Sequence, residues 1–167
     1  MSAPTPSLKA RALRHLARRE HTRAELERKL GSTLRETPAD AAGNGPDGDA
    51  AARIRRTLDE LAARGLLSDE RAAESLMATQ ARRFGHRRLK DNLLARGVPP
   101  DLVRRALQQT RATEYERARD LWQRRFGTAP ADAKELARQM RFLAGRGFDA
   151  DVIRRVLKEQ PSGEDEG

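Results

Sequence analysis

The chain has 167 residues, of which 37% are hydrophobic and only 4% aromatic, so small helical units packed through Leu and Ala are favoured over one large core. It contains no cysteine, which excludes disulfides, thiolate metal sites and a cysteine nucleophile. No apolar run approaches the roughly 20 residues of a transmembrane helix, and the first residues lack a signal-peptide pattern. A cytoplasmic protein without a membrane partner is therefore expected.

The formal net charge of +9 is unevenly distributed. Eight acidic residues lie in residues 36–52 and in the tail 159–167, and neither segment contains Lys or Arg. Without those eight acids the chain has twice as many basic as acidic residues. Such an excess predicts a polyanionic partner, either nucleic acid or an acidic protein surface. The alternative is that arginine merely occupies the solvated faces of an Arg-rich chain.

The first two predicted helices cover about 8–19 and 22–31. The second begins with a Thr22-x-x-Glu25 capping box and is predicted to end at Gly31. Residues 37–50 are rich in Ala, Gly, Pro and Asp without periodicity, which predicts a disordered acidic loop. The third predicted helix has apolar residues at 3.6-residue spacing from Ile54 onward and ends at Gly65.

Six more helices follow. The fourth begins with Ser68 or Asp69 as N-cap and runs to Gly85. The fifth is expected to end at Gly97 in the left-handed conformation, with positive φ, and Pro99 and Pro100 start the sixth. The seventh is predicted to begin with a capping box of Thr113 and Glu116, the eighth with Asp132 and Glu135, and the ninth near Asp149.

The nine helices fall into threes. An apolar-Arg-Arg-x-Leu motif closes each triplet at residues 54–58, 103–107 and 153–157, with starts 49 and 50 residues apart. An Arg-Phe-Gly sequence likewise recurs at 83–85 and 125–127. Repeats of this period are typical of stacked supersecondary units. The sequence thus predicts an all-α tandem array of three-helix repeats at 1–66 (with the disordered insertion at about 37–50), 67–111 and 112–158, followed by a disordered acidic tail at 159–167.

Catalytic and cofactor chemistry finds little support. His15, His21 and His86 share no metal-ligand spacing, and the chain has no phosphate-binding loop of the Gly-x4-Gly-Lys type. The acids lie at helix starts or near a base, where capping and surface pairing explain them. We expect a non-enzymatic protein with no catalytic residues, cofactor or metal.

Arginines form the candidate binding surface. The Arg pairs of the repeated motif lie between inward-facing residues, so their side chains should reach solvent, where stacked repeats would align them along one side. A second cluster surrounds the end of the fourth helix. The candidate contacts are Arg55, Arg56, Arg71, Arg82, Arg83, Arg87, Arg88, Lys90, Arg96, Arg104, Arg105, Arg124, Arg125, Arg154 and Arg155.

The aromatic residues favour a packing role. Trp122 and Phe126 share a helix face and are predicted to fill the core of the third repeat rather than stack on bases, and Phe84 occupies the matching position in the second. The repeats also resemble helix-turn-helix modules, but no Asn or Gln accompanies their Arg pairs for base readout. Contact with the DNA phosphate backbone or with a protein is therefore favoured over sequence-specific DNA recognition.

Two segments carry a resemblance to a known family. Residues 67–74 (Leu-Ser-Asp-Glu-Arg-Ala-Ala-Glu) and 85–98 (Gly-His-Arg-Arg-Leu-x3-Leu-x3-Gly-Val) resemble the signature of the RecX family of bacterial recombination regulators. The chain departs from the family at Ala72, where Phe or Tyr is usual, and in the acidic insertion. The matching positions imply capping by Asp69 and Glu70, helix stops at Gly85 and Gly97, and candidate contacts at Arg71 and Arg88.

The resemblance implies an elongated, curved monomer acting in recombination, DNA repair and the SOS response. It implies a partner, the RecA filament on DNA, whose groove the protein would follow while inhibiting ATP hydrolysis and strand exchange. Single- and double-stranded DNA would be contacted through phosphates. The alternative is a non-specific DNA-binding helical protein without filament preference.

Overall fold

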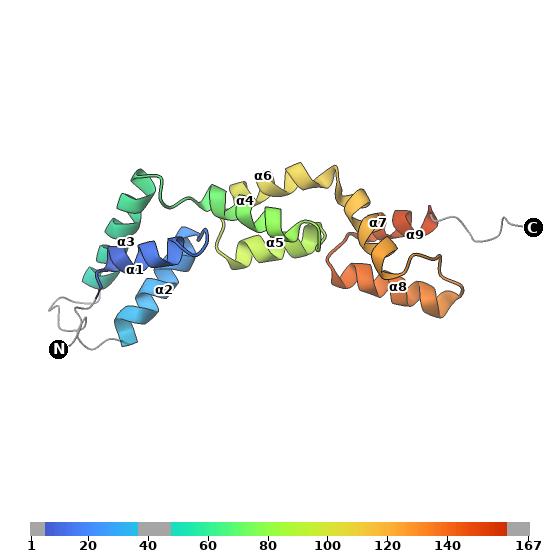
Figure 1. Cartoon of the computed structure of the whole chain (residues 1–167), viewed down its shortest axis with the longest axis horizontal. Coiled ribbons are helices and arrows are strands. Elements are labelled where there is room, and N and C mark those ends of the chain that lie inside the picture. Colours follow the sequence, from blue (N-terminus) through green and yellow to red (C-terminus); the bar gives the residue numbers. More distant parts are fainter. Residues whose placement is uncertain (1–5, 37–47, 160–167) are drawn as a thin grey trace, which may run out of the picture. The chain divides into compact units, whose positions relative to one another are not determined.

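The computed structural model describes residues 6–36 and 48–159, which form nine helices and no strand (Figure 1). The all-helical fold predicted from the sequence is thus confirmed for the described residues. The helices are α1 (Leu8–Leu16), α2 (Arg23–Glu36), α3 (Gly48–Ala63), α4 (Asp69–Gln80), α5 (His86–Ala95), α6 (Pro100–Arg111), α7 (Glu114–Arg125), α8 (Ala133–Gly145) and α9 (Ala150–Lys158). None of these helices combines the length and the apolar character needed to cross a membrane.

The described residues divide into two compact units. Unit 1 contains those up to Ser75 together with Arg96–Pro99, and unit 2 contains Leu76–Ala95 and those from Pro100 onward. The link before α6 therefore belongs to unit 1, although the helices on either side of it belong to unit 2. The division of the chain into three repeats remains a prediction.

Unit 1 contains a core formed by α1, α2 and α3. Leu26, Leu30, Leu58 and Leu61 are fully buried in it, and Ala12 lets α1 approach closely. Burying a leucine side chain contributes about 1.5–3 kcal/mol, so these four side chains account for much of the stability of this core.

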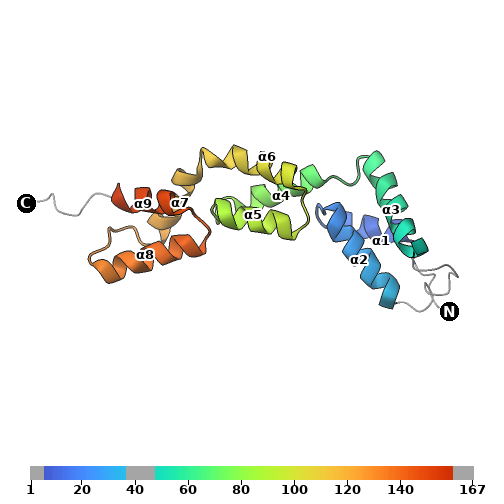
Figure 2. The same ribbon diagram turned by 180° about the vertical axis from the view of Figure 1, so that it is seen from behind.

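Unit 2 contains the α5–α6 pair and the bundle of α7, α8 and α9, which lie together in orange and red in both views (Figure 2). Trp122 is fully buried in the bundle core, where its indole N–H donates to Gln139 Oε1 at 2.7 Å. Phe126 packs partly buried against the same core, as predicted.

Some helix ends differ from the prediction because tertiary contacts override local signals. Gly31 does not end α2, which continues to Glu36 with Leu34 against the core. Gly85 does not end the fourth helix, because α4 already ends at Gln80; instead the main chain of Phe148 approaches Gly85 so closely that no side chain would fit. Gly97 does have the expected positive φ, 76°.

The capping predictions were partly right. Thr22 and Glu25 form a capping box, with each side chain accepting a hydrogen bond from the other residue's main-chain N–H. Asp132 caps α8 through the N–H of Glu135. The box predicted at Thr113 is absent, because that side chain donates to the carbonyl of Thr110 instead.

The fourth helix is capped by Ser68, which accepts from the N–H of Arg71. Asp69, predicted as a cap of its own helix, accepts a hydrogen bond from the N–H of Arg23 and so caps α2 from the start of α4. This partner is distant in the chain and carries no local sequence signal.

The predicted disordered loop and tail lie mostly outside the described residues, at 37–47 and 160–167. The described residues overlap the predicted loop of about 37–50 and the predicted tail at two places. Residues 48–50 belong to α3, and Glu159 accepts a hydrogen bond from Arg155.

Candidate functional site

The three Arg pairs lie on α3, α6 and α9, and all six side chains are exposed. Each pair directly follows a buried apolar residue, Ile54, Val103 or Ile153, which turns the pair away from the core. The six residues are Arg55 and Arg56, Arg104 and Arg105, and Arg154 and Arg155.

Acidic residues on the same helices partly neutralise these pairs. Arg154 pairs with Asp151, and Arg155 pairs with Glu159 at 3.0 Å while lying 4.1 Å from the centre of the Tyr115 ring. Arg105 lies 3.8 Å from Asp101. Exposed pairs of this kind contribute at most about 1 kcal/mol, but they reduce the positive charge that a polyanion would meet, especially on α9.

A second group of basic residues, which we call the middle cluster, differs from the Arg pairs in having no acidic partners among the described residues. Arg82, Arg83, Arg87, Arg88 and Lys90 lie where α4 ends and α5 begins, and all are exposed. None of the five has an ion pair with an acid in residues 6–36 or 48–159. Their charge is therefore available to a partner.

Lys90 also borders an open groove of about 950 Å³ between α5 and α6. The apolar side chains of Leu94, Val103 and Leu107 line it, and Leu94 is 43% exposed. The basic side chains along the groove are Lys90, Arg104, Arg105 and Arg111.

Arg96 and Arg71 both form ion pairs within unit 1. The guanidinium of Arg96 donates to both carboxylate oxygens of Glu25, at 2.9 and 3.2 Å, and to the carbonyl of Glu20. Arg71 pairs with the carboxylate of Glu20 at 3.0 Å. Thr22 Oγ1 donates to the carbonyl of Arg96, so the link before α6 is fastened to the start of α2.

Glu25 is the electrostatic centre of this junction. Its side chain is only 8% exposed, and burial alone would raise its pKa. Hydrogen bonds from Arg96 and Arg19, together with the main-chain N–H of Thr22, outweigh burial and lower the pKa to about 2. Glu25 is therefore ionised at neutral pH and binds two arginines.

A second junction lies within unit 2, between the link before α9 and the start of α5. The N–H of Gly85 donates to the carbonyl of Arg146 at 2.8 Å, and the N–H of Arg87 donates to that of Gly147 at 3.0 Å. Because these bonds use only the main chain, the guanidinium of Arg146 remains free to point elsewhere.

Two charged residues of α7 complete this second junction. Buried Glu114 accepts from the N–H of His86 at 3.0 Å and so caps α5. Arg117 donates to the carbonyls of Ala81 and Phe84, and burial lowers its pKa below the usual value while Glu114 opposes that shift. These contacts do not involve the exposed Arg and Lys side chains of the middle cluster.

Arg124 and Arg125 are both exposed at the end of α7. Arg125 lies 5.7 Å from the centre of the Phe126 ring and 5.9 Å from that of Phe142. Phe142 and Arg146 belong to the same surface but are not among the candidate residues that the sequence indicates. The repeated Arg-Phe-Gly sequence marks part of this surface, but nothing local indicates that α8 contributes to it.

Two of the three histidines lie close together. His15 and His21 are in edge contact, with ring centres 5.6 Å apart, and burial lowers the pKa of both. In the part of the chain that the structure describes, no three His, Asp or Glu side chains are placed to hold a metal ion.

Comparisons with known proteins agree on one family. The model of "RecX, second three-helix domain" matches residues 68–107, and that of "RecX, third three-helix domain" matches residues 112–157. The "Regulatory protein RecX" of Leptothrix cholodnii is 49% identical over 155 residues, covering 93% of this chain and 90% of the relative. That of Chromobacterium violaceum is 44% identical over 157 residues, covering 94% and 93%.

The fold is also similar to a solved structure. The crystal structure of RecX from Lactobacillus salivarius covers 91% of this chain and 93% of its own, with a TM-score of 0.70 and 22% sequence identity. At this level of identity the likeness supports the fold alone.

Proposed function

Because the chain belongs to the RecX family of regulatory proteins, we propose that it regulates recombination by binding the RecA filament on DNA. In this proposal the protein lies in the filament groove, inhibits ATP hydrolysis and strand exchange, and acts by binding rather than by catalysis. It acts as a cytoplasmic monomer built from three-helix repeats. The family-model matches at 68–107 and 112–157 support the second and third repeats.

The observation that carries the proposal is the basic groove between α5 and α6. Its apolar lining suits a protein surface, while Lys90 and Arg104, which pair with no acid in the described chain, suit carboxylates or phosphates. A filament of protein on DNA offers both kinds of surface along one groove.

The direct test is the DNA-dependent ATPase rate of RecA with this protein titrated in. We expect the rate to fall with the wild type. The double variant Lys90→Glu, Arg104→Glu should need at least about tenfold more protein for the same effect, because like charges now face the filament. Arg14→Glu, an exposed substitution on α1, is the charge-changing control and should behave as the wild type. An unchanged ATPase rate with the wild type would refute the proposal.

The second candidate is non-specific DNA binding without filament preference, which the unpaired middle cluster favours. Competition between bare duplex and RecA-coated DNA at physiological salt separates the two. We expect preference for the coated DNA. Equal affinity for bare duplex would favour the second candidate, since phosphate contacts alone depend steeply on salt and little on the protein coat.

A further inference from the structure

Unit 2 has a row of half-buried phenylalanines with arginines over them. Phe84 has Arg83 and Arg88 each 5.6 Å from its ring centre, and Arg146 at 5.8 Å. Arg146 is also 5.4 Å from the centre of the Phe142 ring, so it bridges the two phenylalanines.

The row continues onto α7. Arg125 lies over both Phe142 and Phe126, whose rings meet edge to face with centres 5.3 Å apart. We call the three phenylalanines and the four arginines Arg83, Arg88, Arg125 and Arg146 the Arg–Phe surface. It alternates flat cations and rings across the link between α4 and α5, α5 itself, α7 and α8.

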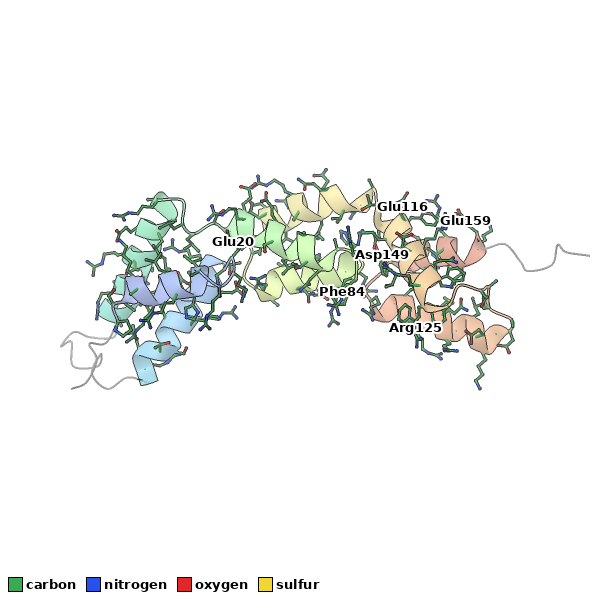
Figure 3. All side chains as sticks on the ribbon, viewed as in Figure 1. Glu20, Phe84, Glu116, Arg125, Asp149 and Glu159 are labelled. Carbon is green, nitrogen blue, oxygen red and sulfur yellow. The ribbon has the colours of Figure 1, made fainter. Side chains whose placement is uncertain are left out.

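Charge on this surface is not neutralised. None of its four guanidiniums has an ion pair with an acid among the residues that the structure describes. Arg138, over Phe126 at 5.5 Å, is excluded from the surface because it pairs with Glu135 at 3.2 Å. In Figure 3, Phe84 and Arg125 lie on the lower edge of unit 2, whereas Glu116 and Glu159 lie on the upper edge.

We infer that the Arg–Phe surface is a binding site for single-stranded nucleic acid. Guanidinium groups donate to phosphates and also present flat faces on which bases stack, as do the partly exposed rings. The rings hold the arginines in place by cation–π contact, which lowers the entropy lost on binding. In a duplex the base faces are stacked on one another, so a duplex would contact the surface only through its phosphates.

Phe84 and Phe126 were predicted as core residues; both are half-buried, and Phe126 packs against the core of the α7–α9 bundle. Only their open sides and the arginines over them face a ligand. The inference deepens the proposed function, because it assigns the DNA contact of that function to one surface. Its test uses DNA without RecA.

The experiment compares three fluorescent probes at physiological salt by anisotropy: an oligothymidine, an abasic strand of equal length and a duplex of equal length. The full chain should bind oligothymidine about tenfold more tightly than the abasic strand, since the abasic strand has the same phosphates but no bases to stack. The double variant Phe84→Leu, Phe142→Leu keeps the apolar volume but removes the rings. It should lose most of that preference while affinity for the abasic strand stays within about twofold.

Tyr115→Leu is the matched control. Arg155 lies over the Tyr115 ring, but Glu159 neutralises the charge of that arginine. This variant should bind oligothymidine as the wild type does. Circular dichroism confirms that each variant is folded, and Arg125→Lys with Arg146→Lys repeats the test without changing charge or any buried ring. That variant should bind oligothymidine about fivefold more weakly, since lysine lacks the planar face.

Several results would overturn the inference. These are equal binding of the abasic strand, tighter binding of the duplex, a Tyr115→Leu loss as large as that of the phenylalanine variant, or stronger competition by polyglutamate than by oligothymidine. If single strands bind all variants equally while the wild type still lowers the RecA ATPase rate, the inference fails and the proposed function stands. If instead the variants lose single-strand binding as expected but the wild type leaves the RecA ATPase rate unchanged, only the proposed function is refuted.

Discussion

The two junctions share one backbone design. In unit 1 the link at Arg96–Gly97 packs on the start of α2, and in unit 2 the link at Arg146–Gly147 packs on the start of α5. Both glycines have positive φ, and a Cβ on either would come within 2.4 Å of the Cβ of Ala24 or Arg88. The same close approach thus occurs twice, 50 residues apart.

The chemistry of the two junctions differs. In the first, Glu25 follows Ala24 and binds the Arg96 side chain; in the second, buried Leu89 follows Arg88 at the equivalent place. The first junction therefore uses the arginine of its link to hold the structure. The second is held by main-chain bonds and by Glu114 and Arg117, and it leaves Arg146 on the Arg–Phe surface. One acidic residue decides whether the arginine of the link stabilises the fold or faces a ligand.

The largest expected effect comes from filling a glycine contact. Gly147→Ala should lower the free energy of unfolding by about 3 kcal/mol or more, because its Cβ would meet the main chain of Arg88 at a positive φ. Gly65→Ala, also at a positive φ but with no atom within 4 Å, should cost only about 1 kcal/mol. Urea unfolding followed by circular dichroism measures both, and equal costs would contradict the close approach.

Next in size is the loss of the Glu25 ion pairs. The pKa of Glu25 in the folded protein, about 2, lies below its ordinary 4.5, so this stabilisation is complete above about pH 5 and is lost as the pH falls towards 2. Glu25→Gln should cost about 2 kcal/mol at pH 7 and much less at low pH. Urea unfolding at a series of pH values tests this. A constant difference between wild type and variant would contradict the assignment.

Arg117 offers a comparable test in unit 2. Arg117→Ala would leave the carbonyls of Ala81 and Phe84 without their donors and should cost about 1–3 kcal/mol. Arg119→Ala, an exposed neighbour on α7, is the control and should change stability by less than about 0.5 kcal/mol. Hydrogen exchange at the start of α5 should rise only in the first variant; an equal rise in both would argue against the role of Arg117.

The smallest effect is expected for Arg71. Its pair with Glu20 is partly exposed, so Arg71→Ala should cost about 0.5 kcal/mol. A loss of RecA inhibition without such a change in stability would show that Arg71 also contacts the partner, as the family resemblance implies.

The sequence predicted those features that depend on local patterns. Apolar spacing located the nine helices, and the capping box at Thr22 and the positive φ at Gly97 followed from neighbouring residues. It could not predict that Asp69 caps α2 or that Glu114 caps α5, because each acid finds its N–H partner in a different helix. For the same reason, the sequence predicted only some of the residues of the Arg–Phe surface.

The contrast between Arg96 and Arg146 is tested most directly by replacing each with Ala and measuring two quantities for both variants, the free energy of unfolding and the affinity for oligothymidine. We expect Arg96→Ala to lose about 2 kcal/mol of stability with affinity within about twofold of wild type. Arg146→Ala should lose about fivefold in affinity with less than about 0.5 kcal/mol of stability. If both variants lose stability and affinity to the same extent, the two arginines do not have the separate roles assigned to them.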